Sequence, residues 1–297
     1  MLRAAEPRFS KSTLKDLLED VIARSDTARQ AQLCQSVLEL WRQEPAFAPY
    51  ALRVFHGLES HLAKVEVEIG QGLEVCELGP GNSLCLAALI ASRGATYVGV
   101  DPWGPTLEPP LYELAKTYFR EQADVDISSL IDTSSDPVRP SSLIQRRQES
   151  EGLGTGSVDL VFSIAVLEHV RDPRHSLSES LRLLRPGGYA LHQIDYEDHR
   201  GRGPAGWDFL RFSTSEWDRL HEGERSRDYT NRLRHSQWCR LIADLGFEVV
   251  EISFDRVRPP NSVNVHPDLG PLTEEDLEIQ SAHFILRRPI AEQILSE

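Results

Sequence analysis

Hydrophobic residues recur at two different spacings along the chain, and the spacing changes near residue 70. Before that point they return every three or four positions, as in amphipathic helices that pack through one face. These apolar stripes are Leu14, Leu17, Leu18, Val21 and Ile22, then Leu33, Val37, Leu40 and Trp41, then Leu52, Phe55, Leu58 and Leu62. We therefore expect residues 1–69 to form an N-terminal helical extension or cap.

After residue 70, short apolar runs alternate with helical stripes. Continuous apolar runs such as 158–164 are typical of parallel strands buried on both faces. The pattern predicts an α/β fold, a Rossmann-like seven-stranded and mostly parallel sheet with helices on both faces. The expected strands are 73–78, 96–100, 143–147, 158–164, 189–194, 247–254 and 282–286.

Helix signals separate several of these strands. Asp172 can cap a helix whose first position is Pro173, with Leu177, Leu181 and Leu184 as its inner stripe. Further helices are expected near Ser83, over 111–119 and over 237–245, whereas 128–142 is rich in Ser, Asp and Pro and predicts a surface excursion.

A glycine turn followed by an acid-tipped strand is the strongest chemical signal. Gly79 and Gly81 directly follow the first predicted strand, and they permit a sharp turn with close backbone approach to a ligand. About twenty residues later, Asp101 ends the second predicted strand, where its carboxylate can accept both hydrogen bonds of a ribose diol. The arrangement predicts a site for an adenosyl cofactor.

Two neighbouring residues separate the cofactor classes that share this geometry. Dinucleotide sites usually have a small third residue where this chain has Leu84. Glu77, two residues before Gly79, would repel a pyrophosphate but can help organise a cationic amino-acid group. The charge pattern favours S-adenosylmethionine over NAD.

Five motifs in order make a family resemblance explicit. They are 77–81 (ELGPG), 99–101 (GVD), 158–163 (VDLVFS), 166–170 (VLEHV) and 184–188 (LRPGG). The chain resembles class I S-adenosylmethionine-dependent methyltransferases over roughly residues 70 to 290. We take 70–290 as the catalytic domain and 291–297 as a C-terminal tail.

The resemblance implies a methyl donor held over the carboxyl edge of the sheet. It places Glu77, Gly79 and Gly81 around the methionyl part and Asp101 at the ribose, and the end of the third strand near adenine. It also implies that the N-terminal helices could cover the donor or form a dimer contact. The expected cofactor-binding residues are Glu77, Gly79, Pro80, Gly81, Asp101, Pro102, Gln148 and Ser163.

Ionisable residues gather where the fifth strand ends, at the edge where open α/β sheets bind ligands. A hydroxyl acceptor is a poor nucleophile while protonated, so a histidine base oriented by a carboxylate would assist transfer. Purely structural roles stay open as alternatives: His192 can be a hydrogen-bonded core histidine, and Glu168 with His169 can merely shape a loop. The candidate catalytic residues are His192, Asp195, His199 and His169.

A metal-dependent variant is the alternative at this edge. Asp195, Asp198 and His199 offer oxygen and nitrogen ligands to Mg²⁺ bridging a vicinal diol. Clustering in one loop does not by itself establish convergence on an ion.

Aromatic and basic residues alternate in a predicted insertion over 196–234. Aromatic faces pack against sugar C–H surfaces while arginine and asparagine bond hydroxyls, which suits a ring-shaped polar acceptor. The segment is similar, more loosely, to glycan- and polysaccharide-associated methyltransferases. The alternative is that these aromatics only fill the core under a cap. The candidate substrate-binding residues are Trp207, Arg211, Asn231 and Arg232.

Composition narrows the partners. The net charge of −14 lacks the basic face that a large nucleic-acid footprint requires. The four cysteines show no metal spacing, and no stretch of about eighteen apolar residues occurs. We expect a cytoplasmic protein that has a small-molecule or glycan substrate, binds no nucleic acid and spans no membrane. The Pro/Asn-rich connection 258–271 could extend over the substrate cleft or serve a homodimer.

Together these patterns predict methyl transfer to a hydroxyl of a small polar acceptor, with a saccharide or glycan preferred. Methylation of an amine or carboxylate in a secondary metabolite is the second enzymatic alternative, and a carboxylate would need no base. A non-catalytic S-adenosylmethionine-binding subunit is the third. The acceptor itself is not determined by these residues.

Overall fold

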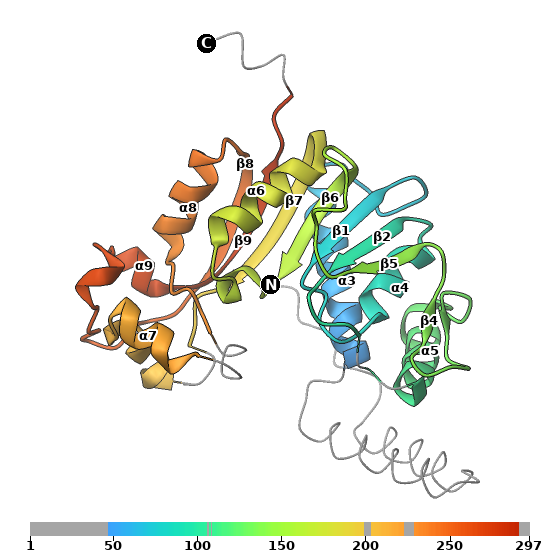
Figure 1. Ribbon diagram of the computed structural model, residues 1–297, viewed down its shortest axis with the longest axis horizontal. Coiled ribbons are helices and arrows are strands. Elements are labelled where there is room, and N and C mark those ends of the chain that lie inside the picture. The colour runs from blue at the N-terminus through green and yellow to red at the C-terminus, as the bar shows by residue number, and fades with distance from the viewer. Residues whose placement is uncertain (1–46, 106, 108, 199–202, 223–228, 291–297) are drawn as a thin grey trace, which may run out of the picture. The chain divides into compact units, whose positions relative to one another are not determined.

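The structure is a computed structural model that describes residues 47–105, 107, 109–198, 203–222 and 229–290. The chain falls into two units, which are described separately (Figure 1). One comprises the chain up to Gly72, with Gly81–Val98 and Trp103–Arg146; the other comprises Leu73–Pro80, Gly99–Pro102 and everything from Arg147. The expected stripes at 14–41 and the tail 291–297 lie outside the described residues.

Seven strands form one sheet in the order β5-β2-β1-β6-β7-β9-β8 (Figure 1). The neighbours β1, β6 and β7 are parallel, whereas β9 runs antiparallel to both β7 and β8. The predicted seven-stranded, mostly parallel sheet is therefore confirmed. The strands are β1 Glu74–Leu78, β2 Thr96–Val100, β5 Ile144–Arg147, β6 Val158–Ile164, β7 Leu184–Asp195, β8 Glu248–Arg256 and β9 Ile279–Arg287.

Helix α3 anchors the unit that contains the N-terminal part. It packs against α4 and α5, and it buries the predicted stripe Leu52, Phe55, Leu58 and Leu62. The helix after the glycine turn begins at Cys85, two residues later than expected. Bounds in this unit are α3 Phe47–Ala63, α4 Cys85–Ser92, α5 Pro109–Ala123, β3 Ile131–Asp132 and β4 Arg139–Pro140.

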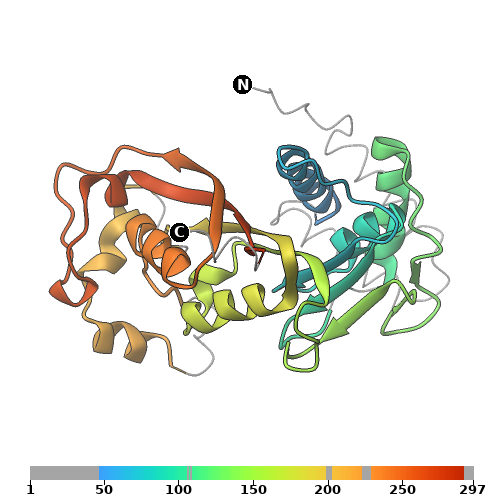
Figure 2. The ribbon, with the colours of Figure 1, turned by 90° about the horizontal axis from the view of Figure 1, so that it is seen from above.

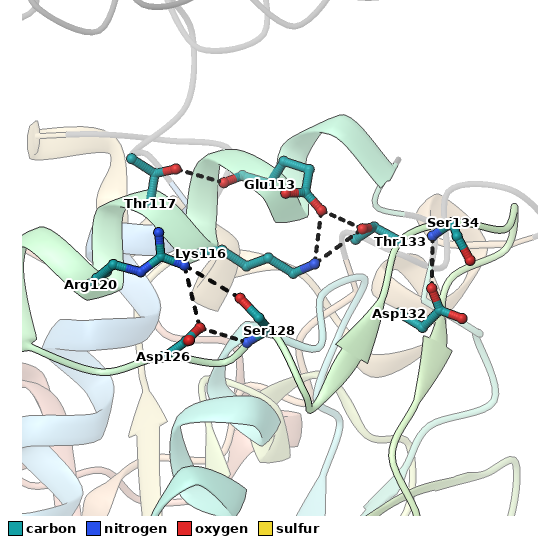
Figure 3. Close-up of polar contacts among 9 residues, drawn as sticks. All are labelled: Glu113, Lys116, Thr117, Arg120, Asp126, Ser128, Asp132, Thr133 and Ser134. Atoms are coloured by element: carbon teal, nitrogen blue, oxygen red, sulfur yellow. Dashed lines mark hydrogen bonds and ion pairs between the residues drawn. The ribbon is translucent and has the colours of Figure 1, made fainter.

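The segment expected as an irregular excursion is tied to α5 by a polar network (Figure 3). The Lys116 ammonium, which is buried, donates to Glu113 Oε1 at 2.8 Å and to Thr133 Oγ1 at 3.1 Å. Arg120 similarly reaches Asp126 Oδ1 at 3.5 Å. Because a buried ammonium is tolerated only when it is paired, these contacts explain why the excursion folds back on the helix and forms the small β3–β4 ribbon.

In the other unit, α6 packs against β6 and β7 (Figure 2). The predicted cap is confirmed, since the Asp172 carboxylate accepts from His175 N at 2.9 Å and Pro173 opens the helix. The expected stripe is confirmed at Leu177, which is buried in α6 together with Ser180 and Leu183. Leu184 is also buried, but it begins β7 because α6 ends at Leu183, and Leu181 is only half-buried.

The described part of the insertion has an aromatic core of its own. Phe209, Leu210, Trp217 and Tyr229 are buried together in it. No helix in the described ranges is both long and apolar enough to span a membrane. The remaining elements of this unit are η1 Leu167–His169, α6 Pro173–Leu183, η2 Gly203–Arg211, α7 Thr214–Leu220, α8 His235–Asp244, η4 Pro267–Leu269 and α9 Glu274–Glu278.

Candidate active site

The turn after β1 is a tight backbone corner with no room for a side chain. Gly79 has φ +69°, and its N–H donates to the Val100 carbonyl at 2.8 Å, which joins the ends of β1 and β2. A Cβ on Gly79 would lie 2.6 Å from both γ-carbons of Val166. Both the left-handed backbone and the close neighbour explain why glycine occupies this position.

Two carboxylates lie buried at the ends of these strands. Glu77 is 6% exposed near the end of β1, and Asp101 is 7% exposed just after β2. The Asp101 N–H donates to the Arg147 carbonyl at 2.9 Å, which places Gln148 directly after that bond with an exposed side chain. The predicted cofactor residues of this unit thus occupy neighbouring strand ends; Pro80 is half-buried and Pro102 is exposed.

Gly81 belongs to the other unit and has open surroundings. Its φ is +66°, and a Cβ on it would meet no atom within 4 Å. Arg146 holds this part of the turn, because its Nη2 donates to the carbonyls of Gly81 at 2.9 Å and Trp103 at 3.0 Å. Gly81 is therefore left with the space that an approaching ligand needs.

The chain leaves β6 through a strained turn. Ala165 adopts φ +51°, a conformation that residues with a Cβ rarely adopt, and η1 follows at once. Strain of this kind costs about 1–3 kcal/mol and persists only where surrounding contacts impose it. The turn places Val166 against Gly79 and carries the Glu168–His169 pair.

Glu168 is a buried carboxyl that favours its protonated form. It is 3% exposed, and burial raises its pKa to about 8, with the charge of Asp195 raising it further against the opposing effect of nearby backbone amides. The ends of β6 and β7 therefore place Glu168 and Asp195 within electrostatic reach of each other. The Asp195 carboxylate also accepts from Glu197 N at 2.9 Å.

His169 has a defined tautomer in its neutral form. Its Nδ1 lies 2.7 Å from the Tyr229 carbonyl, which can only accept, so Nδ1 carries the hydrogen. Nε2 is then the unprotonated nitrogen of the neutral ring, and it lies 4.0 Å from Glu168 Oε1. With its side chain 32% exposed, His169 can reach a bound molecule.

His192 lies in a different environment. It is 1% exposed within β7, and its Nδ1 is 2.8 Å from the hydroxyl of Ser163, which is fully buried in β6. Burial lowers the pKa of His192 to about 4, so the ring is neutral at neutral pH. Its Nε2 has no hydrogen-bond partner among the residues that the structure describes. Ser163 and His192, predicted for the cofactor and for catalysis, are thus brought together in the sheet core.

The possible metal ligands are only partly described. Asp198 is 8% exposed after β7, whereas His199 lies outside the described residues. Within the described ranges, no group of three or more His, Cys, Asp or Glu side chains could hold a metal ion.

Three of the four predicted substrate-binding residues already bond to the chain itself. Trp207 Nε1 donates to the Leu277 carbonyl at 3.0 Å. Asn231 Nδ2 donates to the Leu167 carbonyl at 2.7 Å, and Arg232, which is buried, donates to the Phe212 carbonyl at 2.6 Å. Arg211 is exposed, with its guanidinium carbon 4.9 Å from the centre of the Phe212 ring. Their role in acceptor binding stays a prediction.

Comparison with known families decides the assignment. The family described as "Methyltransferase domain" matches residues 26–252, about three quarters of the chain. The chain belongs to this methyltransferase family. It is a class I S-adenosylmethionine-dependent methyltransferase, as the five motifs predicted.

Individual relatives are distant. The ubiquinone biosynthesis O-methyltransferase of Caulobacter sp. (strain K31) is 29% identical over 177 residues, 56% of this chain and 62% of that protein. The highly reducing polyketide synthase verA of Penicillium polonicum is 23% identical over 177 residues, 59% of this chain but 6% of the synthase. The chain thus spans less than two thirds of either relative. The solved phosphoethanolamine N-methyltransferase 2 of Haemonchus contortus shows 15% identity and a TM-score of 0.44, covering 78% of this chain and 52% of that one.

The residues at the strand ends fit the cofactor of this methyltransferase. S-adenosylmethionine combines a ribose diol with a cationic amino acid, and the site offers the buried carboxylates Asp101 and Glu77. Glu168 was absent from our predicted catalytic set, although its position between a buried strand and His169 could have identified it.

Two glycine substitutions separate steric from conformational effects at the turn. Gly79→Ala is expected to lower the free energy of unfolding by roughly 2 kcal/mol or more, because the new methyl group meets Val166 and φ stays positive. Urea denaturation measures the loss, and calorimetry with S-adenosylmethionine should show weakened binding. Gly57→Ala, in the open interior of α3, is the control and should stabilise by about 0.5–1 kcal/mol. Equal effects at both positions would contradict the packing of Val166 on Gly79.

Glu168→Gln is expected to change how stability depends on pH. Since the folded state holds this proton more tightly than the unfolded chain, the contribution of Glu168 to stability is complete below about pH 4.5 and is lost as the pH rises towards 8. Glutamine cannot ionise, so its free energy of unfolding should not fall in this way. Relative to the wild type, the free energy of unfolding of the variant should therefore rise by up to roughly 1.4 kcal/mol per pH unit over this window. Urea denaturation at pH 5, 6, 7 and 8 measures the difference. The exposed Glu121→Gln in α5 is the control, and parallel stability curves for all three proteins would refute a protonated Glu168.

Proposed function

We propose that this methyltransferase transfers a methyl group to a hydroxyl of a small polar acceptor, with His169 as the general base. The carrying observation is the Nδ1 contact of His169 with the Tyr229 carbonyl, which makes Nε2 the basic nitrogen of the neutral, partly exposed ring. Bound S-adenosylmethionine supplies an electrophilic methyl carbon. Placement and deprotonation of the acceptor are then the tasks of the protein.

His169 suits this task better than His192 does. A base must lie within hydrogen-bond reach of the acceptor proton, and its pKa should lie near the operating pH. His192 is buried in the sheet and has a pKa of about 4, so it would accept a proton poorly at neutral pH. We accordingly assign His192 to the structural pairing with Ser163 and His169 to proton transfer.

Glu168 and Asp195 would tune the charge beside this base. The protonated Glu168 keeps the turn free of a second negative charge at neutral pH, while Asp195 can stabilise the imidazolium that forms when His169 takes the proton. Asp195 comes from the carboxyl end of β7, next to the turn in the sheet edge where α/β proteins bind ligands.

We base the acceptor class on the proposed base in the turn after β6 more than on the residues of the insertion. An O-methyltransferase relative, 29% identical over 56% of this chain, supports oxygen as the methylated atom. Our preference for a saccharide depended on aromatic and basic residues, most of which bond within the chain. We therefore extend the proposed acceptors from saccharides to hydroxylated small molecules, and a glycan remains one member of that class.

The function is tested with isotopically labelled S-adenosylmethionine. The purified chain is incubated with cell extract and with panels of hydroxylated, amine and acid acceptors, and products are found by mass shift. We expect label on oxygen of a hydroxylated compound. Label found only on amines or carboxylates would overturn oxygen transfer, and donor binding with no label in any pool would favour a non-catalytic subunit.

His169→Gln tests the base with the acceptor so identified. Glutamine keeps a polar side chain of similar reach but cannot take a proton, so kcat should fall by about 10²- to 10⁴-fold while donor binding is retained. Steady-state kinetics over pH and calorimetry measure the two effects. The control is His56→Gln on an exposed part of α3, with no change expected. If His192→Gln removes the acidic limb of the pH profile and His169→Gln retains it, His192 is the base instead.

A further inference from the structure

A short segment of the insertion is hydrogen-bonded to the turn that carries Glu168 and His169. We call Tyr229–Asn231 the strap. The Asn231 N–H donates to the Glu168 carbonyl at 2.7 Å, and the Tyr229 carbonyl accepts from His169 Nδ1 at 2.7 Å. The strap therefore meets both residues of the proposed catalytic pair.

The Asn231 side chain completes this grip. Its amide nitrogen donates to the carbonyls of Leu167 at 2.7 Å and Val170 at 3.2 Å, on either side of the catalytic pair. Its Oδ1 accepts from Leu233 N at 3.2 Å. Both amide hydrogens are thus engaged by carbonyls that flank the catalytic pair, so the side chain fixes the turn at two points.

The strap is fixed in turn by the aromatic core of the insertion. Trp217 Nε1 donates to the Thr230 carbonyl at 2.7 Å. Arg171, the second residue after η1, lies with its guanidinium carbon 4.3 Å from the centre of the Tyr229 ring and donates to the His221 carbonyl at 3.1 Å. Residues of the insertion therefore contact the turn, and Arg171, just after the turn, contacts the insertion.

At its other end, the turn contacts the glycine turn that follows β1. Val166 precedes η1 and has both γ-methyl groups against the backbone of Gly79. A shift of η1 would move Val166, and Gly79 offers no free volume on that side. The strap, η1 and the glycine turn consequently form one connected set of contacts.

We infer that Asn231 is a positioning residue that holds the Glu168–His169 turn, so that the insertion sets the geometry of methyl transfer. The kinetic part of this inference rests on the proposed function. Asn231 acts through backbone carbonyls and touches no reacting atom. The His169 tautomer depends on the same strap, because the Tyr229 carbonyl is the acceptor that selects it.

Asn231→Asp in the full chain is the test. The carboxylate matches the amide in size but cannot donate, and it would repel the carbonyls of Leu167 and Val170. We expect ¹⁵N NMR of histidine-labelled protein to show His169 losing its Nδ1–H tautomer. We also expect kcat to fall by roughly 10- to 100-fold, with the acceptor KM and the affinity for S-adenosylmethionine unchanged.

Matched variants keep the result interpretable. Gln71→Glu makes the same amide-to-carboxylate change at an exposed turn and should leave the His169 signals and kcat as in the wild type. Trp217→Phe removes the donor to Thr230 but keeps an aromatic ring, so it should shift the same signals less, even if Asn231→Asp does not fold.

Two results overturn the inference: unchanged His169 signals in both Asn231→Asp and Trp217→Phe, or a normal kcat in a folded Asn231→Asp protein. The NMR result needs no acceptor. A changed tautomer in a protein that methylates nothing would therefore support the strap and reject the proposed function.

Discussion

The contact between Val166 and the bare backbone of Gly79 is the constraint on which the site depends. It joins the turn after β6 to the turn after β1, and a Cβ at Gly79 would lie 2.6 Å from the γ-carbons of Val166, so any side chain there would force Val166 to shift. Ala165, immediately before Val166, has a positive φ, which is unfavourable for a residue with a Cβ. Such a conformation persists only where the surrounding contacts impose it. The donor turn and the proposed catalytic pair are consequently placed by the same few atoms.

Burial then divides the ionisable groups into different roles. Removing a carboxyl or an imidazole from water disfavours its charged form, so the pKa of Glu168 rises to about 8 and that of His192 falls to about 4. His169, at the same strand end but partly exposed, keeps access to a ligand. Two histidines that look equivalent in the sequence therefore differ in what chemistry they can perform.

The described part of the insertion is held together by its own polar residues. Arg232 adopts φ +61°, is buried, and gives its hydrogen bonds to the carbonyls of Phe209 and Phe212, which closes the insertion around Trp217. Its polar residues thus satisfy backbone groups that irregular segments would otherwise leave unpaired. Polar side chains that suggest a ligand site by their composition can instead form hydrogen bonds with backbone groups of the same loop.

The sheet, the glycine turn and the methyltransferase family could be predicted from the residues alone, because these depend on local periodicity, glycine positions and short-range spacing. The bounds of β2 and β6, the Asp172 cap and the stripe of α3 could all be predicted in this way. Only the tertiary structure decided that Asn231 bonds to η1, that His192 is buried and that Glu168 lies near Asp195. These outcomes depend on which segments meet across 27 to 64 residues of chain, and residue type alone carries no information about such meetings.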